Sequence, residues 1–294
     1  MIGSMITGDA DGLWSGRPQP ASRYRSGLPL PVLLVLAKAP VAGRAKTRLC
    51  PPATLVQAAR IAAAALLDTL DAVCAVASAL PVVAWTGELA AAESRGELVR
   101  SLRGVERIEQ RGESLGERIV AAHADVADLF PGAPVLQIGM DTPQLRPSDL
   151  SGALAPLLTP TGPDAVLGPA QDGGWWALGL RDPRAAKAIE QVPTSRSDTG
   201  AATLRALRAA GLTVTLLGTR RDVDTAADAL AVAAAGAGHH FTAEVAATFS
   251  TEAAGTMTTE VAGTFTTGVA GTMTTEVAAT FAAEAAGRAV GMAR

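Results

Sequence analysis

The stretch that decides the fold is Pro31-Val-Leu-Leu-Val-Leu-Ala37, and it runs directly into the basic loop, residues 38–48, with the sequence KAPVAGRAKTR. A short, continuous apolar run is typical of a strand buried on both faces of a parallel sheet. The basic loop holds four cations and no anion, and it falls between the end of that strand and a predicted helix. Doubly wound sheets bind anionic ligands at this place, because backbone N–H groups and the helix dipole add to the side-chain charge. A polyphosphate is the expected ligand, and a solvated basic turn is the alternative.

The same alternation of strand and helix continues along the chain. The pattern predicts further strands at 82–86, 105–109, 134–140, 165–167, 175–180 and 212–217. It predicts helices at 53–79, 88–102, from Ser114 to before Pro131, after a cap at Ser148, at 199–210 and at 225–235. We therefore expect an α/β fold, a single Rossmann-like domain with a mostly parallel sheet and helices on both faces.

Two terminal segments differ in composition from this domain. Residues 1–29 mix Gly, Ser, Pro, Asp and Arg without periodicity, which predicts a flexible leader. From Phe241 to Phe281 a bulky apolar residue recurs every eight positions, giving octads such as MTTEVAGT. This composition favours a disordered tail over 239–294, and a self-associating or partner-binding arm is the alternative. The catalytic domain is expected to span 30–238.

Composition excludes several classes of function. The formal net charge is −3, and residues 241–294 hold five Glu and two Arg, so the rest of the chain carries 23 basic and 23 acidic side chains. A protein without a net basic balance is not expected to bind nucleic acid. Two cysteines form no disulfide framework, and the sequence shows neither a membrane span nor a signal peptide. We expect a cytoplasmic enzyme with no membrane partner.

A carboxylate follows the predicted strand 134–140 in the segment Ile138-Gly-Met-Asp141-Thr-Pro-Gln-Leu145. Asp141 is placed to point into the crevice where phosphates would lie. A hard oxygen ligand suits Mg²⁺, which binds one or two carboxylates together with substrate phosphates. The alternative is an Asx-turn that merely ends the strand.

Two further segments contain candidate carboxylates. In Gly168-Pro-Ala-Gln-Asp-Gly-Gly-Trp-Trp176, adjacent glycines allow close approach of backbone to a ligand, and Asp172 could bind an acceptor. A tight Asp-Gly hairpin turn explains the same residues without a ligand. In Asp222-Val-Asp224-Thr225, Thr225 is a good helix cap, and an Asp there could simply favour the helix N-terminus.

These motifs together resemble a known family. The stretch AKAPVAGRAKTRL resembles the opening signature of the radical-SAM/selenodomain-associated transferases, a glycosyltransferase-A-like branch of the nucleotide-diphospho-sugar transferases. It is similar, more loosely, to the 2-phospho-L-lactate guanylyltransferases. The Gly-rich segment matches the same family, with Trp-Trp where Tyr-Tyr is common, and residues 110–118 resemble its Gln-x-Gly-x-x-Leu-Gly-Glu-Arg element. Val192-Pro-Thr-Ser195 departs from the family's Val-Pro-Trp-Ser-Thr, which puts the acceptor pocket in doubt.

The resemblance implies a transferase that uses Mg²⁺ or Mn²⁺, a nucleotide or nucleotide-sugar, and a small-molecule acceptor. It implies catalytic roles for Asp141, Lys46 and Asp172, and metal binding by Asp141 and Asp224. It implies nucleotide binding by Lys38, Gly43, Arg44, Lys46, Arg48, Gly112 and Arg118, and acceptor binding by Gly173, Gly174 and Trp175. Nucleotidyl transfer is favoured because clustered cations suit a leaving triphosphate, with glycosyl transfer as the alternative. A non-catalytic scaffold is less favoured because Asp141, Asp172 and Lys46 are all present.

Overall fold

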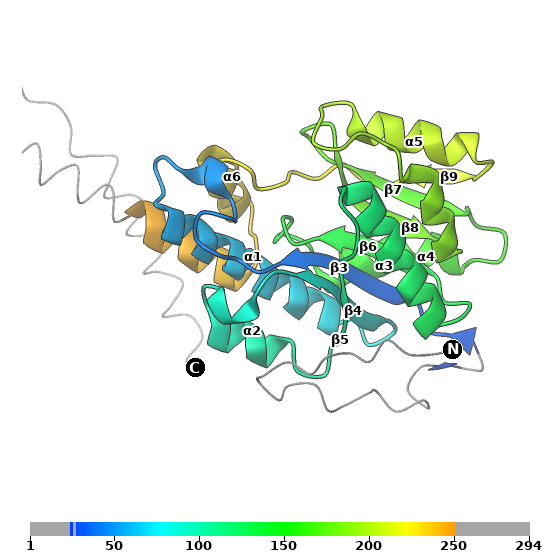
Figure 1. Ribbon diagram of the computed structural model, residues 1–294, viewed down its shortest axis with the longest axis horizontal. Coiled ribbons are helices and arrows are strands. Elements are labelled where there is room, and N and C mark those ends of the chain that lie inside the picture. Colours follow the sequence, from blue (N-terminus) through cyan, green and yellow to red (C-terminus); the bar gives the residue numbers. More distant parts are fainter. Residues whose placement is uncertain (1–23, 26–27, 251–294) are drawn as a thin grey trace, which may run out of the picture. The chain divides into compact units, whose positions relative to one another are not determined.

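The protein is represented by a computed structural model that describes residues 24–25 and 28–250 (Figure 1). The first 23 residues of the expected leader and the repeats after Ser250 lie outside the described residues. Within the expected leader, β1 (Tyr24–Arg25) and β2 (Leu28–Pro29) form a small antiparallel pair. None of the described helices is both long and apolar enough to cross a membrane.

The centre of the domain is a seven-stranded sheet in the order β5-β4-β3-β6-β8-β7-β9 (Figure 1). Its strands are β3 (Val32–Lys38), β4 (Leu80–Thr86), β5 (Glu106–Glu109), β6 (Val135–Gly139), β7 (Ala165–Pro169), β8 (Trp175–Leu180) and β9 (Val214–Leu216). The pairs of β3 with β4 and β6, β4 with β5, and β7 with β9 are parallel. Only β8 runs antiparallel to its neighbours β6 and β7. The expected mostly parallel sheet is confirmed.

Helices cover both faces of this sheet. The α-helices are α1 (Leu55–Cys74), α2 (Arg95–Ser101), α3 (Leu115–Leu129), α4 (Pro147–Leu158), α5 (Thr199–Ala209) and α6 (Ala226–Ala234), and the short helices are η2 (Thr47–Leu49), η3 (Leu89–Ala91) and η4 (Pro183–Ile189). Alternate residues of β3 divide between the faces: Leu33 and Val35 share a core with α1, α2 and α4, whereas Leu34 shares one with α3. Because β3 is buried on both faces, its sequence is an unbroken apolar run.

Side-chain caps set several helix starts. Ser114 and Glu117 form a reciprocal capping box at α3, as the sequence predicts, and Thr225 does the same with Asp228 at α6. The predicted cap at Ser148 is wrong, because α4 already begins at Pro147, whose missing N–H makes it a suitable first residue.

The expected domain end at residue 238 is too early. Residues 239–250, drawn in orange in Figure 1, form a helix, and the compact unit extends to Ser250. Phe241 is fully buried and belongs to a cluster with Ile61 and Val223. Burying a phenylalanine contributes about 2–3 kcal/mol, so the first octad is part of the core.

Backbone hydrogen bonds fix the start of the 239–250 helix. The Asp68 carboxylate on α1 accepts from the N–H groups of His240 at 3.1 Å and Phe241 at 2.8 Å. The Gly238 N–H donates to the Pro143 carbonyl at 3.0 Å, two residues beyond Asp141. A Cβ on residue 238 would meet the Asp68 carboxylate at 2.1 Å, so the close approach requires glycine.

Candidate active site

A cavity of about 700 Å³ lies at the carboxyl edge of the parallel strands. Lys38 ends β3 and Thr86 ends β4, while Gln110 and Asp141 follow β5 and β6 closely. All five motifs of the sequence contribute residues to its lining. The predicted site residues that line the cavity are Lys38, Arg44, Lys46, Arg48, Arg118, Asp141, Asp172, Gly174, Trp175 and Asp224.

Lys46 is the most deeply buried cation of the cavity. Its backbone is left-handed, with φ 49°, directly before η2, and its side chain is only 10% exposed. Its Nζ lies 2.9 Å from Asp141 Oδ1 and 3.2 Å from Asp224 Oδ1, and it donates to the Val223 carbonyl. Burial alone lowers the pKa of this ammonium, but Asp141 and then Asp224 outweigh burial and raise it above its usual value. Lys46 is therefore a permanent cation among carboxylates.

Four carboxylates line the same cavity as this buried ammonium. Besides Asp141, Asp172 and Asp224, the structure brings in Asp222, whose Oδ1 is buried without a hydrogen-bond partner. Burial, and then the charges of Asp141 and Asp172, raise the pKa of Asp222 to about 7. Sequence reasoning quoted Asp222 but gave it no role. The Asp-x-Asp spacing at 222–224 was the available signal.

The Asp141–Asp224 site fits a hard divalent cation. Both carboxylates contact the same point, the Lys46 ammonium, while remaining 43% and 38% exposed toward the cavity. Asp222 Oδ1 is buried without a hydrogen-bond partner, and Asp141, Asp172 and Asp224 add negative charge around Asp222. A bound cation would compensate both features. Oxygen-only donors suit Mg²⁺ or Mn²⁺ rather than a thiolate-preferring metal.

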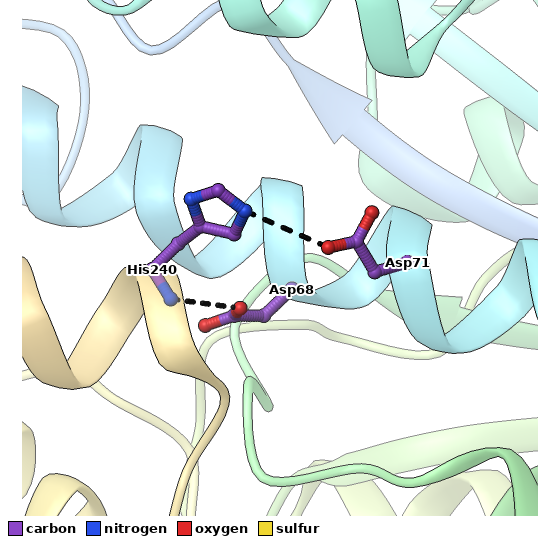
Figure 2. Close-up of side chains that lie close together, drawn as sticks. All are labelled: Asp68, Asp71 and His240. Carbon is purple, nitrogen blue, oxygen red and sulfur yellow. Dashed lines mark hydrogen bonds and ion pairs between the residues drawn. The ribbon is translucent and has the colours of Figure 1, made fainter. Parts of the chain in front are cut away.

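A second acidic group lies away from this cavity, on the outer side of α1. Figure 2 shows Asp68, Asp71 and His240, whose ligand atoms lie within 4.8 Å of one another. Both Asp68 oxygens already accept backbone N–H groups of the 239–250 helix, and His240 Nε2 lies 3.6 Å from Asp71 Oδ2. Its contacts are those of a helix anchor, and the cluster needs no metal to explain it.

The other cations of the basic loop are less constrained than Lys46. Lys38 Nζ donates to the Arg44 carbonyl at 2.7 Å, which closes the loop on itself. Arg48 is 74% exposed and lies 3.4 Å from Asp224 Oδ2. Gly43, predicted to bind nucleotide, is not among the cavity-lining residues and has a φ of 76°, which favours glycine; its nucleotide role stays a prediction.

The Gly-rich segment forms the turn of the β7–β8 hairpin. Asp172 Oδ1 accepts from the Gly174 N–H at 2.8 Å, so the Asx-type turn is present, yet Asp172 also lines the cavity. Gly173 does not line it. A Cβ at Gly173 would meet the Ser197 carbonyl at 1.8 Å, so Gly173 lets the 194–197 segment pack against the turn. Thr194, Ser195, Arg196 and Ser197 also line the cavity; the sequence connected Thr194 and Ser195 with the acceptor pocket only as a departure from the family motif.

The two tryptophans of this segment have different surroundings. Trp175 lines the cavity, as expected of an acceptor-binding residue. Trp176 also borders the cavity, but it is only 5% exposed, and its Nε1 donates to the Gly218 carbonyl at 2.9 Å.

The 110–118 element lines the cavity beyond β5 and at the start of α3. Gln110 Nε2 donates to the carbonyls of Ala37 at 2.9 Å and Ala84 at 2.8 Å. Arg118 Nε donates to the Gly112 carbonyl at 2.9 Å. Gly112, predicted to bind nucleotide, is absent from the lining and has φ 124° with Glu117 too close for a Cβ. Its role is to shape the turn that holds Arg118.

Comparison with known proteins identifies relatives of this chain. It is 33% identical over 198 residues to a phosphoenolpyruvate guanylyltransferase from Nocardia farcinica, an alignment that covers 66% of this chain and 82% of the relative. The chain belongs to the family of that guanylyltransferase. Residues 69–196 also match a family described as an uncharacterized protein conserved in bacteria (DUF2064).

A solved structure gives the same answer for the fold. A nucleotide-diphospho-sugar transferase-like protein from Desulfovibrio desulfuricans G20 is 27% identical, with a TM-score of 0.59, over 67% of this chain and 83% of the other. The expected superfamily and transferase class are confirmed by these two relatives. The association with radical-SAM proteins stays a prediction.

Proposed function

We propose that this protein is a Mg²⁺-dependent, cytoplasmic guanylyltransferase that transfers a guanylyl group from GTP to a small phosphorylated acid. The observation that carries the proposal is the contact of Lys46 with both Asp141 and Asp224 beside a cation-rich loop. Such a site combines positive side chains for a triphosphate with oxygen ligands for a cation. The family relative, named for guanylyl transfer to phosphoenolpyruvate, supports the same chemistry.

The proposed reaction is a single displacement at the α-phosphorus of GTP. A phosphate oxygen of the acceptor forms a new P–O bond, the bond from the α-phosphorus to the bridging oxygen breaks, and pyrophosphate leaves with that electron pair. A phosphate dianion is already deprotonated near pH 7, so the attack needs no general base. Catalysis then depends on positioning and on stabilising the charge that develops on the leaving group.

The chain's own cations would supply much of that stabilisation. Lys38, Arg44 and Arg48 line the same cavity as the carboxylates, and Lys38 and Arg48 would exchange their contacts with the Arg44 carbonyl and Asp224 for contacts with a triphosphate. Lys46 is held in place by Asp141 and Asp224, so its charge is preorganised. A divalent cation held by Asp141 and Asp224 would neutralise phosphate charge when bound.

The acceptor is proposed to bind beside Trp175 and the 194–197 segment. Hydroxyl groups of Thr194, Ser195 and Ser197 and the Arg196 guanidinium are donors that suit a phosphate or carboxylate. Phosphoenolpyruvate, the acceptor in the relative's name, combines both groups and is the first compound to test.

Glycosyl transfer is the second candidate, favoured by the similarity to the nucleotide-diphospho-sugar transferase-like structure. The same cavity would then hold a nucleotide-sugar, an acceptor hydroxyl would attack the sugar carbon, and a nucleoside diphosphate would leave.

The two chemistries differ in the product released. The full chain is incubated with Mg²⁺ and either GTP plus phosphoenolpyruvate or a panel of nucleotide-sugars with hydroxylated acceptors. Pyrophosphate release that requires the acceptor, with a guanylylated product found by mass spectrometry, supports the proposal. Nucleoside diphosphate release from a nucleotide-sugar, without pyrophosphate release from GTP, would replace it with glycosyl transfer.

A further inference from the structure

The amide of Gln110 presents only an acceptor to the cavity. Its Nε2 has two hydrogens, and two backbone carbonyls, Ala37 O and Ala84 O, take both of them. If Nε2 and Oε1 of the amide were exchanged, Oε1 would face the two carbonyl oxygens and would be repelled by them. The two carbonyls therefore fix the orientation of the Gln110 amide. The Gln110 backbone N–H is fixed as well, by the Trp85 carbonyl at 2.9 Å. Oε1 is therefore the one polar atom of this side chain left to meet a ligand.

The Gln110 amide and the 194–197 segment offer opposite hydrogen-bonding chemistry to the cavity. The segment has the donors of Thr194, Ser195 and Ser197, which suit an anionic acceptor. The fixed oxygen of Gln110 would instead repel the oxygens of a phosphate or carboxylate. Lys46 and its carboxylates line the same cavity, and the phosphates are proposed to bind there. With its phosphates at Lys46 and its acceptor at the 194–197 segment, a nucleotide therefore directs its base toward Gln110.

Two other residues of the cavity lining suit the faces of a flat aromatic ring. Leu115, at the first turn of α3, is 44% exposed and lines the cavity. Arg118 lies three residues further along the same helix face, and its guanidinium is held by the Gly112 carbonyl. An apolar side chain and a planar cation are both partners for the face of a base.

We propose that Gln110 is a specificity-determining residue that selects guanine by accepting hydrogen bonds from its N1–H and N2 amino groups. Guanine is the common base that places two adjacent donors on this edge, whereas adenine and cytosine pair a donor with an acceptor and uracil flanks one donor with two acceptors. One fixed oxygen can accept from both guanine donors. The inference rests on the proposed nucleotide site, but it does not depend on which bond is broken.

The test compares binding of GDP and IDP, which differ only in the N2 amino group and which neither candidate reaction consumes. Wild-type protein should bind GDP about 10-fold more tightly than IDP by calorimetry, the size expected for one lost hydrogen bond in a built site. In Gln110→Leu the ratio should fall to about 1, mainly through weaker GDP binding. Glu109→Leu removes the exposed neighbouring side chain and should keep the 10-fold ratio.

Loss of the two amide donors could unfold Gln110→Leu, so a second variant is needed. Gln110→Lys keeps donors for the Ala37 and Ala84 carbonyls but has no acceptor, and it should also lose the discrimination. Equal binding of GDP and IDP by wild type, no binding of either, or a 10-fold ratio retained in both variants would overturn the role of Gln110. A selective protein that releases no pyrophosphate would keep this inference and remove the proposed guanylyl transfer.

Discussion

The Lys46 ammonium lies 2.9 Å from the Asp141 carboxylate and is shared with Asp224, which is 178 residues away in the sequence. This contact ties the loop after β3 to the loop before α6 across the cavity. The two carboxylates are therefore held at a fixed point even though both are partly exposed. The following predictions test what that arrangement does.

Neutralising Asp141 should remove activity without unfolding the protein. Asp141→Asn keeps the shape of the side chain but loses the charge that binds Lys46 and, in the proposed function, the cation. We expect pyrophosphate release to fall by about 100-fold or more, a loss typical of a removed electrostatic group in an active site. The melting temperature should change little because Asp224 still pairs with Lys46. Asp71→Asn, an exposed carboxylate on α1, is the control and should retain activity.

Removing the buried ammonium should separate cation binding from turnover. In Lys46→Met the carboxylates of Asp141 and Asp224 lose their common partner, so Mn²⁺ should bind more tightly in the absence of nucleotide. Turnover should nevertheless fall by about 100-fold, because a preorganised positive charge is gone. Electron paramagnetic resonance of free Mn²⁺ measures the first effect, and pyrophosphate release the second. Weaker Mn²⁺ binding than in wild type would show that Lys46 holds the two carboxylates in a binding geometry.

Acid should destabilise the fold through His123. Burial lowers the pKa of this imidazole from 6.5 to about 4, although its hydrogen bond to Gln137 at 2.9 Å opposes the effect. Between these two values the unfolded chain binds a proton that the folded chain does not, so the free energy of unfolding decreases as pH falls. The total loss is about 3 kcal/mol, reached near pH 4.

His123→Gln isolates this contribution because glutamine can donate to Gln137 and does not titrate. Urea unfolding at pH 7 and pH 4.5 should show a smaller loss of stability in the variant than in wild type. Parallel losses in the two proteins would mean that His123 is already protonated in the fold or that the imidazole has access to water.

The first octad should be required for stability, whereas the later repeats should not. Phe241→Ala removes a fully buried ring from the cluster with Ile61 and Val223, and we expect a loss of about 3–5 kcal/mol in the free energy of unfolding. A chain ending at Ser250 should melt at the temperature of the full chain, but one ending at Gly238 should melt well below it. Equal melting temperatures for the two truncated chains would remove the 239–250 helix from the folded core.

Local patterns in the sequence were sufficient to predict most strands of the sheet. The apolar run of β3 and the capping box at Ser114 are signals carried by neighbouring residues, and each appears where it was expected. The motif carboxylates Asp141 and Asp224 also reach the cavity. These features follow from hydrophobic periodicity and from the rule that the carboxyl ends of parallel strands lie at one edge of the sheet. They can therefore be predicted from the sequence alone.

The features that were missed depend on contacts between distant segments. Phe241 occupies the same octad position as the later repeats, and only its contact with Ile61 and Val223 distinguishes it. In the sequence, Asp222 looks like any aspartate that precedes a helix. Only in the fold is it buried near Asp141 and Asp172, which raises its pKa. The glycines at 43, 112 and 173 have positive φ values, and 112 and 173 also make close approaches, which only the folded chain shows; their predicted ligand roles stay predictions.

Asp68 anchors the 239–250 helix, and this distinguishes the first octad from the repeats after Ser250. The first copy is tied through Gly238 to Pro143, near the proposed metal ligand Asp141, so its sequence is expected to be under the same selection as the active site. Repeated coding sequence gains and loses units readily when DNA is copied. Because the anchored copy is the one joined to the enzyme, units can be added or deleted after Ser250 without shifting any residue of the cavity.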